Sequence, residues 1–333
     1  MRHLPLALLT AVLSLAFLAG EMAAQDKVVI IDPAKANDDY RFQGEYLGPF
    51  AEDGDEATIG AQVVAMGGGK FQIRIHAGGL PGAGWKRGGE LETASGVRSS
   101  DGSVVVTREN GQRLQFQLKD GVMLLVAGDK IVGRLKKVER ASKTLGKKPP
   151  AGAVVLFDGS EKSAANFTRG QIVMGNLLRH DCESKETFGD HHMHLEFRTP
   201  FIPAARGQGR GNSGMYVQGR YEVQVLDSFG LDGKNNECGG IYSISEPKVN
   251  MCLPPLVWQT YDYDFTAARY DDAGKKVKNA RITLWHNGVV IHDDLELPKG
   301  TPGKHPEADG PGILYLQGHG NPVVFRNIWA TKK

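Results

Sequence analysis

Recognisable amphipathic helices are scarce in this sequence of 333 residues, and neither sign of charge is in clear excess. The 40 Lys and Arg residues against 38 Asp and Glu give a formal net charge of +2, which indicates no particular class of partner. Glycine is abundant, at 43 residues. Many glycines with few helices predict an all-β protein with many turns. The length predicts two domains, each with enough residues for a core.

Cysteine is rare: Cys182, Cys238 and Cys252 are the three present, and none forms a CxxC pair, so they do not predict a metal site. An odd count leaves at least one thiol free or paired between chains. The spacing of Cys238 and Cys252 allows a disulfide in an oxidising compartment, and it equally allows buried free thiols.

The apolar run 4–18 follows Arg2 and His3 and ends before Ala23 and Ala24. It is short for a membrane span and has small residues at its end, which predicts a secretory signal peptide over 1–24. We therefore expect export to a periplasm or beyond, with no stable membrane span in the mature protein. An uncleaved anchor is the alternative.

Turn and strand patterns divide the rest into an N-terminal β-rich domain (26–140), a linker (141–152) and a C-terminal β-domain (153–333). The Gly-rich segment 78–89 lacks a GK[ST] ending and is predicted to be a loop. The basic run 134–148 has no interleaved aromatics and abuts Pro149, so it predicts a solvated linker and no nucleic-acid site. Strands of the first domain are expected at 62–66, 70–75, 103–108, 113–119 and 122–126, with Asn110-Gly111 and Asp120-Gly121 among the turns.

The most distinctive stretch is a predicted hairpin over 211–230, with strands at 215–218 and 221–226 joined by Gly219-Arg220. Side chains alternate along a strand, so Glu222 and Gln224 should share one face while the Tyr and Val residues between them face the other way. A face rich in hydrogen-bonding groups suits a sugar, which offers hydroxyls at its rim.

Several short motifs of the second domain, in this order, resemble the 3-keto-disaccharide hydrolase family, whose members are described as 3-keto-glucoside lyases and 3-keto-glucal hydratases. The resemblance covers nearly all of 153–333 and implies a concanavalin A-like jelly-roll β-sandwich with a concave polar face that holds an oligosaccharide or 3-keto-sugar. The QGEYLG segment at 43–48 is similar to a leader domain often joined to this family in exported bacterial proteins. The motifs are LFDG (156–159), NSGMYVQGRYEVQVLD (212–227), CGGIY (238–242), PP (254–255) with WQT (258–260), WHNG (285–288), LQGH (316–319) and FRNIW (325–329).

A strand at 192–198 alternates His192, His194, Glu196 and Arg198 with apolar residues, which predicts a row of ionisable groups on one face. We expect this row beside Glu222, although an exposed sheet face gives the same pattern. No cofactor is predicted. A divalent metal bound by the two histidines is a lesser hypothesis, because i and i+4 on a flat strand are roughly 13 Å apart.

The chemistry of a 3-keto-glycoside indicates which residue types are needed. The ketone acidifies the C2 hydrogen, a base removes it, the C1–O bond breaks by elimination, and hydration completes a net hydrolysis. This requires a base, an acid and a group that polarises the ketone. The catalytic candidates are Glu222, Glu196 with His194, His319 and Asp227; the substrate-binding candidates are Tyr216, Gln218, Arg220, Gln224, Gln317, Arg326 and Trp258.

Some roles stay open at this level. Asp227 could equally cap a turn, Arg220 and Arg326 could brace carboxylates, and a strand Trp is as often core as a stacking platform. An ordinary two-carboxylate glycosidase and a non-catalytic lectin-like module are the alternative functions.

Overall fold

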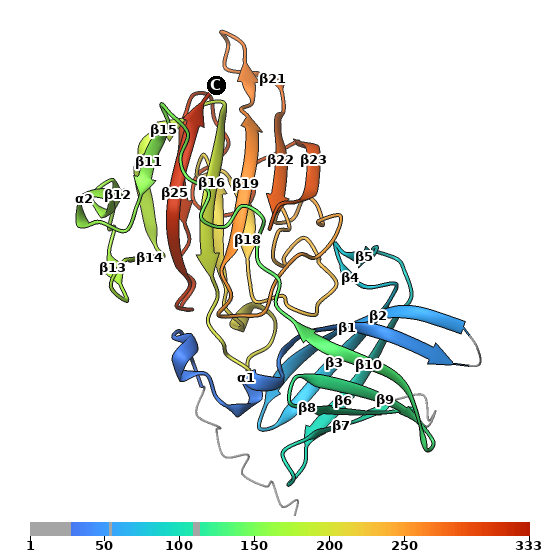
Figure 1. Cartoon of the computed structure of the whole chain (residues 1–333). Helices are drawn as coiled ribbons and strands as arrows, with labels where there is room; N and C mark the ends of the chain where they lie inside the picture. The colour runs from blue at the N-terminus through green and yellow to red at the C-terminus, as the bar shows by residue number, and fades with distance from the viewer. Residues whose placement is uncertain (1–27, 53–54, 109–113) are drawn as a thin grey trace, which may run out of the picture.

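The computed structural model describes residues 28–52, 55–108 and 114–333, and it consists of two β-domains (Figure 1). The expected signal peptide and the Asn110-Gly111 turn lie outside the described residues. Among the described residues, no helix is long and apolar enough to cross a membrane. The prediction of a mostly β protein is confirmed.

The N-terminal domain is a closed antiparallel barrel. Each strand of the barrel is hydrogen-bonded to the barrel strands before and after it in the chain, and the first pairs with the last. Alternate residues point inward, and Tyr46, Val63, Ile73 and Phe116 are among the side chains that fill it. Its strands are β1 (Gly44–Glu52), β2 (Asp55–Gly67), β3 (Lys70–Ala77), β6 (Leu91–Arg98), β7 (Val104–Arg108), β8 (Leu114–Lys119), β9 (Val122–Ala127) and β10 (Lys130–Val138).

Small elements complete this domain. The 3-10 helix η1 (Pro33–Lys35) and helix α1 (Asp38–Phe42) precede the barrel, and the side chain of Asn37 accepts a hydrogen bond at the start of α1. The predicted Gly-rich loop contains the two-residue strands β4 (Leu80–Pro81) and β5 (Gly84–Trp85).

The C-terminal domain is a sandwich of two antiparallel sheets around one core. The larger sheet contains β11 (Val154–Phe157), β13 (Ile172–Val173), β14 (Leu177–Arg179), β16 (His191–Arg198), β19 (Gln259–Thr266), β22 (Ala280–His286), β23 (Val289–Leu297) and β25 (Val324–Lys332). The smaller sheet has the order β12 (Phe167–Thr168), β15 (Cys182–Phe188), β24 (Gly312–Leu316), β17 (Ser213–Val217) and β18 (Tyr221–Val225). Outside the sheets lie α2 (Glu161–Ala164), η2 (Gly207–Gly209) and the pair β20 (Arg269–Tyr270) and β21 (Lys276–Lys278).

The predicted hairpin is formed by β17 and β18, and the chain turns through Gln218 and Gly219 with φ values of 54° and 67°. Met215 and Val223 face the core, whereas Tyr216 and Glu222 lie directly opposite each other on the other side of the sheet. The edge of β18 is covered, because residues 239–242 exchange backbone hydrogen bonds with it. Such cover protects an edge strand from pairing with other chains.

The basic run 134–148 is the predicted solvated linker only in its second part, where Lys143, Lys147 and Lys148 are exposed. Its first residues belong to β10, since the Lys and Arg side chains alternate with residues that point into the barrel. The remainder runs along the outer face of the larger sheet before entering β11 (Figure 1), and Ser142 in it is buried. The segment follows this face because side chains of the larger sheet accept hydrogen bonds from it.

The two domains share buried contacts. Phe201 of the second domain lies in the core cluster of the barrel, and Val64 of the barrel lies in that of the sandwich. Arg210 is buried between them: its Nε donates to Asp227 Oδ2 at 2.7 Å and its Nη1 donates to the carbonyl of Ala65 at 3.2 Å. Each of the three cysteines is a buried free thiol.

Candidate active site

A cavity of about 310 Å³ opens on the side of the smaller sheet that faces away from the core. Two strands provide its floor, β17 through Tyr216 and β18 through Glu222 and Gln224. Loops supply the walls. The wall residues are Gln208, Asn212, Asn236, Tyr242, Pro302, Gly303, Gln317 and His319.

Glu222 is the only carboxylate among the described residues that line this cavity. It is 4 % exposed, and no Lys or Arg of the described chain forms an ion pair with it. Burial raises the pKa of Glu222 to about 7, although a hydrogen bond from Tyr216 opposes part of the rise. A carboxyl group that titrates near neutrality can take up or release a proton at physiological pH.

The space around this carboxyl group depends on Gly214, which lies beside Tyr216 on β17. A Cβ at position 214 would lie 2.6 Å from Glu222 Oε1 and 3.1 Å from the ring of Tyr216. Glycine is therefore required here for close approach.

Amide side chains complete the polar surface. Gln224 donates through Nε2 to Asn212 Oδ1 at 2.8 Å and to the carbonyl of Ser213 at 2.9 Å, which leaves Oε1 for a ligand hydroxyl. Gln317 donates through Nε2 to the hydroxyl of Tyr216 at 3.1 Å, and its Oε1 is buried without a partner. A buried oxygen without a donor is unusual and points to a missing ligand or water.

Five of the residues predicted for the site thus lie together, and His319 is exposed at the cavity wall. These are Tyr216, Glu222, Gln224, Gln317 and His319. Sequence reasoning missed Asn212, Asn236 and Tyr242. Asn212 directly precedes the hairpin and Tyr242 ends the CGGIY motif, so both motifs carried a signal that was not used.

Glu196 and His194 do not join this cavity, contrary to the expectation that they lie beside Glu222. They belong to β16 of the other sheet, and their side chains point away from the shared core. The two groups of ionisable residues therefore occupy opposite outer faces of the sandwich. Alternation along a strand predicts which residues share a face but not which sheet the strand joins.

The carboxylate of Glu196 is fully engaged in hydrogen bonds and an ion pair with neighbouring residues. Burial alone would raise the pKa of Glu196, but hydrogen bonds from His194, Asn327, Gly146 and Arg326 outweigh it and lower the pKa to about 2. The Arg326 Nε lies 2.7 Å from Glu196 Oε2. This arrangement holds the carboxylate in its charged form and binds the linker.

The residues next to Glu196 on the larger sheet extend this set of hydrogen bonds. His194 Nδ1 lies 2.8 Å from Asp262 Oδ1, and Thr144 of the linker donates to Asp262 Oδ2 at 2.6 Å. Burial lowers the pKa of His194, but hydrogen bonds and charges from Asp262 and Glu196 raise it above its ordinary value. His194 also stacks on Trp329, with ring centroids 5.2 Å apart.

The remaining predicted residues bind protein groups rather than the cavity. Trp258 lies against two guanidinium groups, 4.9 Å from Arg198 and 3.9 Å from Arg326. Gln218 donates to the carbonyl of Phe188 at 2.8 Å.

Arg220 and Asp227 are also engaged elsewhere. Arg220 donates to the carbonyl of Gly310 at 2.9 Å and to Gln218 Oε1 at 3.1 Å. Asp227 is fully buried and paired with Arg210 at the domain junction.

The metal hypothesis finds no cluster to support it. In the described ranges, no group of three or more His, Cys, Asp or Glu side chains is arranged to hold a metal ion. His192 instead lies 3.1 Å from Asp264 through its Nδ1.

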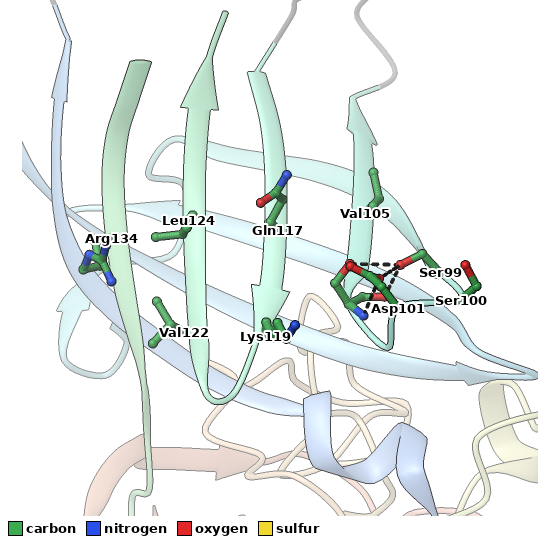
Figure 2. A pocket seen from close by; sticks show the side chains of 10 residues that line it. Ser99, Ser100, Asp101, Val105, Gln117, Lys119, Val122, Leu124 and Arg134 are labelled. Atoms are coloured by element: carbon green, nitrogen blue, oxygen red, sulfur yellow. Dashed lines mark hydrogen bonds between the residues drawn. The ribbon is translucent and has the colours of Figure 1, made fainter. Parts of the chain in front are cut away.

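A second hollow, of about 570 Å³, lies on the outside of the barrel (Figure 2). Gln117, Leu124 and Arg134 project from its strands, and Asp101 sits at one end. Asp101 is already bonded to the hydroxyl and amide of Ser103. None of the unpartnered buried side-chain atoms of the described residues belongs to this hollow. The cavity around Glu222 is therefore the candidate active site.

Comparison with known proteins identifies the family. The family model for the 3-keto-alpha-glucoside-1,2-lyase-like domain matches residues 152–331, which include every residue of the Glu222 cavity. The chain belongs to this family. The 3-keto-alpha-glucoside-1,2-lyase-like domain thus comprises the sandwich, and the barrel precedes it.

Solved structures are also similar to part of this chain. A crystal structure from Parabacteroides distasonis, described as a "putative glycosyl hydrolase", is 31 % identical, with a TM-score of 0.51 over 56 % of this chain and 86 % of that one. Two further structures from the same organism have the same description. One is 18 % identical, with a TM-score of 0.38 over 54 % of this chain and 99 % of that one. The other is 16 % identical, with a TM-score of 0.40 over 55 % of this chain and 94 % of that one. A comparison with curated proteins found no match. Together, the 3-keto-alpha-glucoside-1,2-lyase-like domain and the first of these structures indicate a carbohydrate-active enzyme.

Proposed function

We propose that this protein cleaves 3-keto-glycosides by removing the C2 proton, eliminating the group at C1 and hydrating the product. The observation that carries the proposal is Glu222, a buried carboxyl group with a pKa of about 7 at the floor of a polar cavity. Family membership supplies the substrate class. The ketone makes the C2 hydrogen acidic enough for a carboxylate base.

Glu222 is assigned the role of general base. Its carboxylate takes the C2 proton, the electron pair of the C2–H bond becomes part of the enolate, and collapse of the enolate expels the oxygen at C1. The C1=C2 double bond that results is part of a 3-keto-glucal. Addition of water across it gives the free 3-keto sugar. Because the protonated form of Glu222 is stable near neutral pH, the same group can return the proton during hydration.

His319 is assigned to the leaving group. It is exposed at the cavity wall, where the aglycone of a sugar held over Glu222 would extend toward solvent. An imidazole can act as a general acid toward the departing oxygen.

We further propose that the protein is exported, on the basis of the apolar run and small residues within 1–24. We also propose, from family membership, that the sandwich has the jelly-roll topology. Expression with and without residues 1–24, followed by fractionation, tests export: the full chain should leave the cytoplasm and the shortened chain should stay.

The test of function compares 3-keto-disaccharides with the same unoxidised disaccharides. We expect turnover of the keto form alone, and its loss in Glu222→Gln, which keeps the size of the side chain. Turnover of the plain sugar alone would identify an ordinary glycosidase, a reading to which the single cavity carboxylate lends no support. Binding of either sugar without turnover would identify a lectin-like module. Both outcomes reject the proposal.

A further inference from the structure

Neither arginine among the predicted substrate-binding residues can polarise the substrate ketone. Arg220 and Arg326 lie outside the cavity and bond to backbone carbonyls and to Glu196 respectively. No Lys or Arg is among the described residues that line the cavity. With His319 assigned to the leaving group, the remaining donors among the described lining residues are neutral amides and hydroxyls.

Tyr216 occupies the required place. It lies directly opposite Glu222 in the register of β17 and β18, and such cross-strand pairs have Cβ atoms about 4.5–5.5 Å apart. The C2 hydrogen and the C3 oxygen of a 3-keto sugar sit on adjacent carbons. A base and a donor on neighbouring strands can therefore reach both at once.

The hydroxyl of Tyr216 is held in position from two sides. Gln317 Nε2 donates to it at 3.1 Å, and the carbonyl of Pro302 lies 3.4 Å away. Gly303 lies so close that a Cβ there would be 2.4 Å from the hydroxyl oxygen. Positioning of this kind lets a donor act without reorganising during the reaction.

The environment keeps the hydroxyl protonated. Burial, and next the charge of Glu222, raise the pKa of Tyr216 well above its ordinary value. In the free protein the hydroxyl lies near enough to Glu222 to affect its pKa, and it donates to the carbonyl of Pro302 at 3.4 Å. A substrate placed between the two side chains would offer its C3 oxygen as the new acceptor.

We propose that Tyr216 is a catalytic residue that donates a hydrogen bond to the C3 oxygen, with Gln317 as its positioning residue; this rests on the proposed function. As Glu222 takes the C2 proton, the C–H electron pair forms the C2=C3 bond and the carbonyl π electrons move to the C3 oxygen. Tyr216 stabilises the resulting enolate oxygen. When the enolate collapses, the electrons restore the ketone and expel the C1 oxygen.

The test isolates the first step. Exchange of the C2 hydrogen of methyl 3-keto-glucosides for deuterium is followed by NMR in D₂O at several substrate concentrations. Tyr216→Phe should lower the maximal exchange rate about 10²- to 10³-fold, the usual cost of removing one oxyanion donor, with little change in the concentration for half-saturation. Gln317→Met should lower it less.

Tyr315→Phe is the matched control. Tyr315 pairs with Tyr216 on the adjacent strand, with ring centroids 5.3 Å apart, but it does not line the cavity. The Tyr315→Phe variant should exchange the C2 hydrogen of the substrate at the wild-type rate. If Tyr216→Phe does not fold, as judged by circular dichroism, Gln317→Met decides the matter through its own loss of maximal rate.

The two proposals fail in different ways. If the wild-type protein neither exchanges the C2 hydrogen nor releases methanol from the methyl 3-keto-glucoside, the proposed function is wrong. If the wild type exchanges it and folded Tyr216→Phe does so within threefold of that rate, or Gln317→Met shows no loss, the role of Tyr216 is wrong and the proposed function stands.

Discussion

The backbone amide of Gly146 donates to Glu196 Oε1 at 2.6 Å, which ties the segment between the domains to the outer face of the larger sheet. Glu196 on β16 thus binds the segment that connects the two domains, whereas Glu222 on β18 faces an open cavity. The following predictions separate these two roles.

The activity of Glu222 should depend on pH in a specific direction. A general base must be deprotonated, and the pKa of Glu222 is raised to about 7. We therefore expect kcat/KM for a 3-keto-glucoside to be low at pH 5 and to rise through pH 7 to a plateau. A profile without a transition between pH 6 and 8 would argue against Glu222 as the base.

The same group should reduce stability at high pH. The pKa of Glu222 in the folded state lies above its ordinary value of 4.5, so its contribution to stability is fully favourable below pH 4.5 and is lost as pH rises through about 7. The difference amounts to about 3 kcal/mol, since one pKa unit corresponds to about 1.4 kcal/mol. Urea unfolding should show Glu222→Gln to be more stable than wild type at pH 8, with a much smaller difference at pH 4.

Gly214→Ala should disable the cavity. Its Cβ would collide with the Glu222 carboxyl group and the Tyr216 ring, so both must move. We expect loss of most activity and about 1–3 kcal/mol of stability. Gly189→Ala is the control, because an added Cβ there meets no atom within 4 Å. Equal activity of the two variants would show that the close approach does not matter.

Arg326→Leu should destabilise the protein without removing its chemistry. It removes one of several hydrogen bonds to the buried Glu196, and because Arg326 is itself 36 % exposed we expect a loss of about 1–3 kcal/mol. Limited proteolysis should cut the linker around 141–150 faster than in wild type. A hundredfold fall in kcat in the folded variant would instead indicate that this face takes part in catalysis.

Acid should loosen the same face. The pKa of Glu196 is lowered to about 2 from 4.5, so the stability that it contributes is present above pH 4.5 and is lost as pH falls toward 2. The protection of the linker from a protease active in acid should therefore decrease between pH 4.5 and 2. In Glu196→Gln the protection should vary less over this range.

Substrates should be uncharged. Without a Lys or Arg among the described lining residues, a carboxylate or phosphate on the sugar would be placed near Glu222 without a counter-charge. We expect kcat/KM for a 3-keto-glucuronide to fall at least about 100-fold below that for the 3-keto-glucoside, a difference of about 2.7 kcal/mol. Equal turnover of the two sugars would contradict this prediction.

Local features of the fold were predictable from the sequence. The hairpin of β17 and β18 follows from the alternation around Glu222 and the Gly219 turn, and this correctly gave Tyr216, Glu222 and Gln224 a common location. The barrel strands β1, β6 and β10 were missed. Inward-facing positions of these strands hold residues without an apolar side chain, such as Gly96 and Gly133, which weakens the apolar alternation on which strand prediction depends.

Long-range relationships were not predictable from pattern. The alternation of His194 and Glu196 is the same whether β16 lies beside β18 or across the core from it, because strand order depends on contacts between distant segments. The contacts of the linker with the larger sheet were also hidden, since Thr144 and Gly146 resemble ordinary loop residues until Asp262 and Glu196 are placed beneath them.

The path of the linker has a consequence for dividing the protein. Lys147, through its carbonyl oxygen, accepts hydrogen bonds from Trp329 and Asn327, so the last strand of the sandwich depends on residues that precede the family domain. A fragment starting at 153 would lack Gly146 and Thr144, which donate to Glu196 and Asp262, and would open this face to water. Recombinant fragments should accordingly begin before Ser142 if the catalytic half is to remain soluble by itself.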